Sequence, residues 1–416
     1  MRPELEWETV ELSQICTYRH ERIEVGKLTT SNYISTANML PEKGGIRAAD
    51  GLPKAKTASK FYPGDVLVSN IRPYFKKIWL ATREGGCSND VLVMQARDGT
   101  HAPYLYYLLS SDAFFAYMTA TAKGTKMPRG DKDAIMGYMA KKPPLDVQCA
   151  FADTLACLDR KIAVNDRVCR NLEEQAQLIF KRWFVDFAPF RSCGFVQSEL
   201  GLIPKGWQIV SILDMVVSTF AGDWGKAEPE GNFIQKVGCI RGTDLPDVQQ
   251  GSKGKIPVRY IQTRNLLGKR LQADNLVVEI SGGSPVQSTG RIARISRHLL
   301  NRFDADLICT NFCSALAVKS PYSIFLYHFW LYLYGQGRMF GYENGTTGIK
   351  NFDLQRFLKN TLIALPPRGI VEEFNELMEA LEAKVYSLAS ESEVLANLRD
   401  TILPPLISGA LDLPRD

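Results

Sequence analysis

Two stretches of the chain carry apolar residues at an alternating spacing of four and three. This heptad spacing predicts a long helix with one apolar seam. Pro143 and Pro144 stand before the first stretch and Pro189 after it, so we expect its helix to end near Phe187. Asn165 is a polar seam residue, of the kind that can fix the register of paired helices. The seam positions are Phe151, Leu155, Leu158, Ile162, Asn165, Cys169, Leu172, Ala176, Ile179 and Trp183.

The second stretch repeats the first at an offset of 223 residues. We expect its helix to stop near Leu403, because Pro404 and Pro405 follow. About 35 residues at roughly 1.5 Å each give a helix of about 50 Å. We expect the two helices to pack on each other in antiparallel orientation; the alternative is that each packs only on its own domain. The second seam is Phe374, Met378, Leu381, Val385, Leu388, Ser392, Leu395, Arg399, Ile402 and Leu406.

The segments before the two helices diverge, but they begin and end alike. Each begins with a tryptophan, Trp7 in one and Trp207 in the other. Each has a Gly-Thr segment, at 123–126 and at 344–347, before its Pro-Pro pair. The chain is therefore a repeat in which the bodies differ and the helical tails match. This is expected if the bodies recognise different ligands and the tails share one function.

Both bodies mix strand and helix signals, so we predict an α+β fold. Two globular domains in a pseudo-twofold repeat would be separated by two long antiparallel coiled-coil helices. The expected boundaries are 1–148 for the first domain, 149–190 for the central helix, 191–368 for the second domain, and 369–416 for the C-terminal helix and tail.

Positive charge is concentrated in two separate segments of a chain whose net charge is +5. Residues 53–83 hold seven Lys/Arg against one Asp/Glu, and residues 241–302 hold eleven against four. Two basic segments predict two surfaces that face a polyanion. The DNA-binding candidates are Lys54, Lys56, Arg72, Lys76, Lys77, Lys123, Lys126 and Arg129 in the first domain, and Arg241, Lys253, Lys255, Arg259, Arg264, Gln287, Arg291 and Lys350 in the second. For any one of them, an ordinary solvated surface charge is the alternative.

Nine scattered cysteines without a Cys-x-x-Cys motif, and four distant histidines, favour ordinary thiols in a reducing compartment and no metal site. No apolar run reaches the roughly 18–20 residues of a membrane helix, and the N-terminus has no signal core. We therefore expect a cytoplasmic protein that contacts no membrane.

Neither body carries a recognisable catalytic motif. Gly-x-Gly-x-x-Gly, Walker, His-Glu-x-x-His and the Asn/Asp-Pro-Pro-Tyr/Phe motif of adenine methyltransferases do not occur. Residues 281–284 (SGGS) could cradle a phosphate, but the segment lacks a helix-opening context. We expect no catalytic residues and no cofactor in this chain.

Several segments resemble one known family. They are residues 172–190 (LEEQAQLIFKRWFVDFAPF), 201–207 (GLIPKGW), 158–165 (LDRKIAVN), 397–409 (NLRDTILPPLISG) and, more weakly, 280–291 (ISGGSPVQSTGR). In these segments the chain resembles the specificity subunits of type I restriction-modification enzymes, and the resemblance covers nearly the whole chain. One departure is local: Gln148 follows the first Pro-Pro pair, but the second pair lacks that glutamine.

The resemblance implies a non-catalytic subunit in which each body is a target-recognition domain for double-stranded DNA. The target would be two short, different sequences around an unread spacer. Two methyltransferase subunits, which bind S-adenosylmethionine, would dock on the helices, and a motor-nuclease subunit would join them. Trp183, Phe184 and Phe187 are the partner-binding candidates, with core packing at a helix end as the alternative.

Three other functions compete with this one. The first is a two-domain nucleic-acid-binding adaptor without a methyltransferase partner. The second is a stand-alone enzyme with a novel site, which the missing motifs disfavour. The third is a coiled-coil scaffold, which would not need two large basic bodies.

Overall fold

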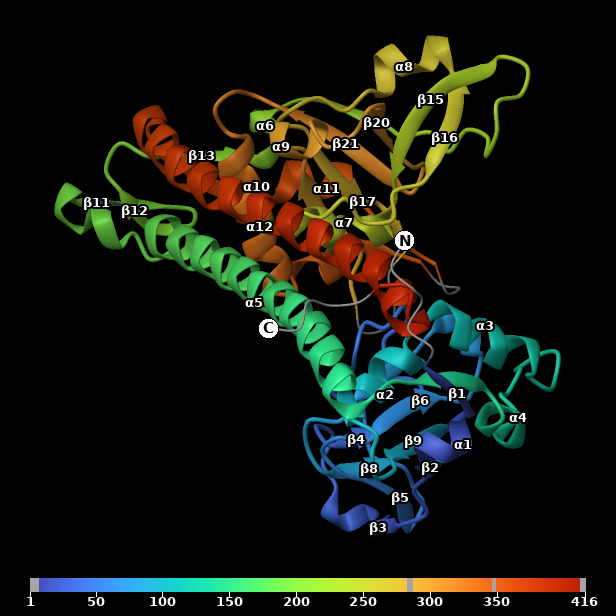
Figure 1. The fold of residues 1–416 in the computed structure, drawn as a ribbon. Coiled ribbons are helices and arrows are strands. Elements are labelled where there is room, and N and C mark those ends of the chain that lie inside the picture. The colour runs from blue at the N-terminus through green and yellow to red at the C-terminus, as the bar shows by residue number, and fades with distance from the viewer. Residues whose placement is uncertain (1–6, 283–286, 346–348, 412–416) are drawn as a thin grey trace. The chain divides into compact units, whose positions relative to one another are not determined.

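The computed structural model describes residues 7–282, 287–345 and 349–411 (Figure 1). The chain divides into two compact units. The first unit comprises residues 1–161 and 394–416, and the second comprises residues 162–393. Each unit therefore contains one body together with parts of both long helices.

The predicted long helices are present as α5 (Leu145–Phe184, 40 residues) and α12 (Arg368–Ser408, 41 residues). Within the second unit they run antiparallel, since Asn165 donates to Glu391 Oε2 at 2.9 Å and Cys169 Sγ contacts the Val385 carbonyl. Asn165 is buried in this seam, as its heptad position predicted. Burying a polar residue against one specific partner opposes a shift in register, because a shift would leave the amide without its bond.

The prediction that the second helix stops near Leu403 is wrong. Helix α12 continues through Pro404 and Pro405 to Ser408. Each proline lacks an N–H and crowds the carbonyl four residues earlier, which disfavours a helix interior. Burial outweighs this cost here, because Leu403 and Leu406 are buried in the core of the first unit.

The first unit is built on a four-stranded antiparallel sheet with a second sheet beside it. Its core joins Val66, Val68 and Met94 of the four-stranded sheet to Leu105, Leu108 and Phe115 of two helices. The four strands, in order, are β2 (Cys16–Tyr18), β9 (Val91–Ala96), β6 (Val66–Ser69) and β7 (Ile78–Leu80). The second sheet is β3 (Arg22–Glu24), β5 (Thr57–Phe61), β8 (Gly85–Cys87) and β4 (Tyr33–Ile34). The helices are α2 (Ala102–Leu109) and α3 (Asp112–Ala120).

The second unit has the same plan. Its four-stranded sheet is, in order, β14 (Val216–Ala221), β21 (Cys313–Val318), β17 (Leu276–Glu279) and β19 (Ile292–Arg294). A neighbouring sheet holds β16 (Val258–Gln262), β15 (Phe233–Ile240) and β20 (Asp306–Cys309). Helix α10 (Ser323–Gly335) corresponds to α2. Helix α2 follows β9 and α10 follows β21, and these two strands hold the same position in their sheets.

Details at the ends of the bodies show that the repeat is structural. A strand that follows the leading tryptophan pairs with the strand that leads into the long helix, as β1 (Glu8–Glu11) with β10 (Met139–Lys142) and β13 (Gln208–Ser211) with β24 (Leu362–Leu365). The helix before this last strand is capped by an aspartate in both units: Asp131 caps α4 (Lys132–Met136), and Asp353 caps α11 (Leu354–Asn360). The predicted α+β repeat with two long helices is confirmed.

Candidate nucleic-acid interface

Each unit brings the same two loops together at one end of its four-stranded sheet. One loop joins β6 to β7 in the first unit and β17 to β19 in the second. The other loop precedes the aspartate-capped helix, which is α4 in the first unit and α11 in the second. In the first unit Gly130 N donates to Asn70 O at 3.1 Å and Arg72 N donates to Pro128 O at 2.8 Å. In the second unit Phe352 N donates to Ile280 O at 2.8 Å, and β18 (Ser281–Gly282) pairs with β23 (Lys350–Phe352). We call residues 70–77 with 121–130 the first loop pair, and residues 280–291 with 343–352 the second loop pair.

The first Gly-Thr segment, and the described residues Asn344 and Gly345 of the second, fall in these loops. Residues 123–126 belong to the first loop pair, where Lys123 and Arg129 exchange backbone hydrogen bonds of 2.8 and 2.9 Å. Residues 346–348 of the second segment lie outside the described residues, as do residues 283–286 of the possible phosphate cradle. The repeat predicted from sequence therefore marks equivalent loops.

A third loop completes the first loop pair and strains its backbone. Glu42 N donates to Phe75 O at 2.8 Å, and Lys43 N donates to Lys76 O at 2.9 Å. Six non-glycine residues have positive φ in the described chain, and four of them lie here: Glu42 (53°), Lys43 (60°), Arg72 (51°) and Lys76 (49°). A left-handed conformation costs on the order of 1 kcal/mol for such residues, and strain of this kind gathers at functional sites.

The first loop pair collects six of the eight DNA-binding candidates of its domain. They are Arg72, Lys76, Lys77, Lys123, Lys126 and Arg129. Lys54 and Lys56 lie instead on an exposed segment before β5. Sequence reasoning missed Lys43, because only hydrogen bonds between distant loops bring it here.

Two cations of the first loop pair lie in exposed ion pairs. Arg129 pairs with Asp90 at 3.0 Å and Lys123 pairs with Asp131, with the side chains of Arg129 and Lys123 57% and 80% exposed. Lys43 and Lys76 share Asp112, and the hydrogen bond from Lys76 lowers the pKa of that carboxyl. Exposed pairs contribute about 0–1 kcal/mol, so a phosphate could replace Asp90 or Asp131 at little cost.

Lys77 differs from its neighbours. Its Nζ donates to the Thr36 carbonyl at 2.6 Å, and burial lowers its pKa. This geometry makes Lys77 a brace of the loop. Lys126 is exposed, and no ion pair reaches it from the described part of the chain.

Cations of the second loop pair are engaged with carboxylates. Arg291 forms two hydrogen bonds with Glu279, at 2.8 and 2.6 Å, and the two side chains are only 17% and 5% exposed. Lys350 binds Glu343 at 2.8 Å, and Glu343 also accepts hydrogen bonds from Thr289. Gln287 is exposed. The equivalent loops thus present less free positive charge.

The other five candidates of the second domain belong to other segments of the chain. Arg241 binds Asp244 and the Lys255 carbonyl, and Lys253 lies over the Phe303 ring at 5.7 Å. Lys255 is exposed. The remaining two are Arg259, which stacks on Trp224 at 4.1 Å, and Arg264, which is exposed on α8 (Thr263–Lys269).

The three partner-binding candidates pack inside the second unit. Phe184 is buried, with its ring 4.9 Å from those of Phe374 and Phe325. Trp183 lies 6.0 Å from Phe374, and Phe187 lies 5.3 Å from Trp207. Trp183 and Phe187 keep half-buried surfaces that a partner could contact. Core packing accounts for Phe184.

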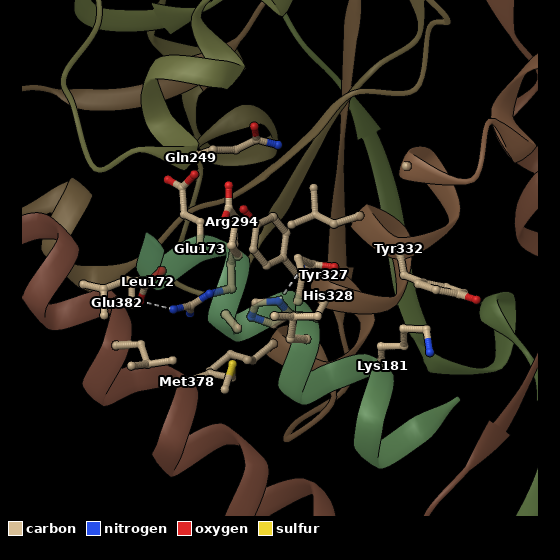
Figure 2. A pocket seen from close by; sticks show the side chains of 18 of the residues that line it. Leu172, Glu173, Lys181, Gln249, Arg294, Tyr327, His328, Tyr332, Met378 and Glu382 are labelled. Carbon is tan, nitrogen blue, oxygen red and sulfur yellow. Dashed lines mark hydrogen bonds and ion pairs between the residues drawn. The ribbon is translucent and has the colours of Figure 1, made fainter. Parts of the chain in front are cut away.

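A cavity of about 660 Å³ opens between α5, α10 and α12 within the second unit (Figure 2). Its lining is mostly apolar and includes Leu172, Tyr327, Leu331, Met378 and Leu381. Sequence periodicity identified some of these as seam residues, but it gave no sign of a cavity, because helix α10 comes from a distant part of the chain.

Titratable side chains with shifted pKa values line this cavity. Burial raises the pKa of Glu173 to about 7, and no described residue hydrogen-bonds to its buried Oε1. Burial lowers the pKa of His328 to about 3, so the ring is neutral; its Nδ1 lies 2.8 Å from Gln177 Nε2. Arg294 pairs with Glu382 at the edge of the cavity (Figure 2). An apolar partner carrying a hydrogen-bond donor would suit this site.

No helix in the described ranges is long and apolar enough to cross a membrane. Among the same residues, no three His, Cys, Asp or Glu side chains are grouped so that they could hold a metal ion.

Comparison with known proteins identifies relatives of the chain, although no protein-family model matches it. It is 24% identical over 322 residues to the type I restriction enzyme MjaIX specificity subunit of Methanocaldococcus jannaschii, covering 76% of this chain and 70% of the relative. It is 28% identical over 197 residues to the HindI specificity subunit of Haemophilus influenzae, covering 45% and 42%.

A solved structure supports the fold. The crystal structure of the type I restriction-modification system S subunit from M. genitalium matches with a TM-score of 0.56 and 12% identity, covering 100% of this chain and 98% of that one. The resemblance drawn from the sequence is confirmed: this chain is a relative, in sequence and in fold, of the specificity subunits of type I restriction-modification enzymes.

Proposed function

We propose that this chain is the non-catalytic, sequence-specific DNA-binding subunit of a type I restriction-modification enzyme. The observation that carries the proposal is the loop pair, which has the same backbone hydrogen bonding in both units and different side chains in each. A repeated scaffold with divergent loops suits a reader of two different short sequences. The target is therefore bipartite and asymmetric.

The two bodies divide the work of recognition. Residues 1–148 and 191–368 are the target-recognition domains, and the helices between and after them set the length of the unread spacer. Exposed Lys and Arg side chains position each domain on phosphates, while other side chains contact base edges in a groove of double-stranded DNA. Lys123, Lys126 and Arg129 are first among the phosphate contacts, because they are exposed and loosely paired.

The long helices dock the partner subunits. Two methyltransferase subunits, which supply S-adenosylmethionine and flip the target adenine, bind along α5 and α12, and a motor-nuclease subunit joins the complex. The apolar cavity beside α5 and α12 and the half-buried Trp183 and Phe187 support a docking role for this region.

Methylation mapping tests this function. The chain is co-expressed with a type I methyltransferase subunit from the same genome, and methylated adenines are mapped across the host DNA. We expect methylation at one split, asymmetric motif that disappears when this chain is omitted. Methylation that is unchanged without the chain contradicts the proposal.

A variant separates DNA recognition from assembly. In the double variant K126E/R129E two exposed cations become anions, so we expect methylation to fall while the methyltransferase still co-purifies with the chain. Loss of co-purification would instead place assembly at the first loop pair. A wild-type chain that binds duplex DNA but never co-purifies with a methyltransferase would support the adaptor alternative.

A further inference from the structure

The first loop pair carries an exposed aromatic pair that phosphate contacts do not use. Tyr74 and Phe75 are 46% and 38% exposed, and their ring centroids are 4.8 Å apart. They sit in the short helical turn η2 (Pro73–Phe75) at the end of the β6–β7 hairpin. On the second loop of the pair Met127 is also exposed, next to Pro128, whose carbonyl accepts from Arg72 N. We call Tyr74 and Phe75 the aromatic tip.

Backbone contacts on both sides hold the aromatic tip in place. Left-handed residues, Arg72 and Lys76, flank it. The Phe75 carbonyl accepts from Glu42 N, and the Lys76 carbonyl accepts from Lys43 N. Pro73 is buried beneath it. The turn thus holds its two aromatic side chains in a fixed place with 46% and 38% of their surface exposed, and strained backbone of this kind gathers at functional sites.

The surroundings of the tip specify its ligand. Lys43, Arg72 and Lys76 lie directly beside it, and Lys123 and Arg129 lie on the second loop of the pair. A ligand for this surface must offer many negative charges and an apolar surface together. Double-stranded DNA does so where a thymine methyl group lies in the major groove, or where a base face is exposed at a partly unstacked step.

We propose, resting on the function above, that Tyr74 and Phe75 are specificity-determining residues which recognise bases of the first half-target by apolar contact. The hairpin loop of the second loop pair has no aromatic residue between 280 and 291. An aromatic contact from this hairpin is therefore expected at the first half-target.

The test uses the chain assembled with its methyltransferase and the target duplex found by methylation mapping. The double variant Y74A/F75A is compared with M139A, which removes an apolar side chain of the same unit that is 55% exposed on β10. We expect the double variant to bind the target about tenfold more weakly, and an unrelated duplex less than about twofold more weakly. M139A should leave both affinities unchanged. Equal losses on both duplexes, or no loss on the target, overturn the proposal.

Two duplex modifications identify the apolar surface. Uracil in place of each thymine removes one methyl group, and 2-aminopurine brightens where stacking is lost. A single uracil that weakens the wild type but not Y74A/F75A indicates a methyl contact. Brightening that the wild type causes and the variant does not indicates an opened step. If neither modification responds, the tip does not contact bases. Failure of the proposed function gives a different result, since the wild type itself then prefers no duplex.

Discussion

The two loop pairs share a backbone plan and differ in what their charges do. In the first, Lys123 and Arg129 are exposed and loosely paired. In the second, Arg291 is locked to Glu279 and Lys350 to Glu343. The same scaffold therefore supports two kinds of loop surface. In the first loop pair, cations can leave their carboxylates and bind phosphates. In the second loop pair, the cations stabilise the fold. A count of basic residues in the sequence does not distinguish these two situations.

The largest expected effect is on the free energy of unfolding, which should respond differently to the loss of a buried ion pair and of an exposed one. Glu279→Ala leaves Arg291 buried without its partner, so the free energy of unfolding should fall by about 3–5 kcal/mol. The matched change Asp90→Ala, which frees Arg129 on the first loop pair, should lower it by less than about 1 kcal/mol. Urea denaturation measures both. Similar losses for the two variants would remove the distinction between the loop pairs.

A half-buried carboxyl in the second unit predicts a pH dependence. Burial raises the pKa of Glu173 from its ordinary value of 4.5 to about 7, so the folded state binds a proton more tightly than the unfolded state does. The contribution of Glu173 to stability is therefore greatest below pH 4.5 and is lost as the pH rises to about 7. Glu173→Gln removes the ionisable group. The variant should therefore gain free energy of unfolding over the wild type at pH 8 and gain less at pH 5, and the two gains should differ by on the order of 1 kcal/mol after allowance for solvent screening.

The neighbour of Glu173 supplies the control for this measurement. Glu174 is exposed on the same turn of α5, so Glu174→Gln should change stability little at either pH. Equal pH dependence in wild type and Glu173→Gln would show that Glu173 titrates normally.

The smallest expected effect concerns DNA binding. Lys126→Ala removes one exposed charge of the first loop pair, so affinity should fall by about two- to fivefold on every duplex, and the salt slope should fall by about one. Lys350→Ala of the second loop pair should leave the slope unchanged, because Glu343 already neutralises that charge. Titrations at several salt concentrations check both. A lower slope for Lys350→Ala would show that this lysine also contacts phosphate.

Local sequence patterns predicted the helices and the repeat well, because heptad spacing and the matched Pro-Pro pairs record interactions that recur along the chain. The end of α12 was missed, because burial of Leu403 and Leu406 in the first unit outweighs the cost of two prolines. That burial depends on residues such as Phe151, far away in the sequence.

Local sequence patterns could not predict which groups pair with the cations of the candidate interface, because those groups come from other segments of the chain. Strand pairing decides that Glu279, twelve residues before Arg291, meets its guanidinium. Hydrogen bonds between loops decide that Lys43 joins Lys76. The sequence itself shows that these loops are basic, but which cations are free depends on contacts that no spacing rule records.

The return of α12 into the first unit has a consequence for synthesis of the protein. Leu403 and Leu406 belong to the same core as Phe151 and Leu155, yet the ribosome makes the whole second unit between them. At about 5–20 residues per second, the first body waits on the order of tens of seconds with part of its apolar core uncovered. A prematurely terminated chain consequently lacks a complete first unit even though nearly all of that unit has been translated.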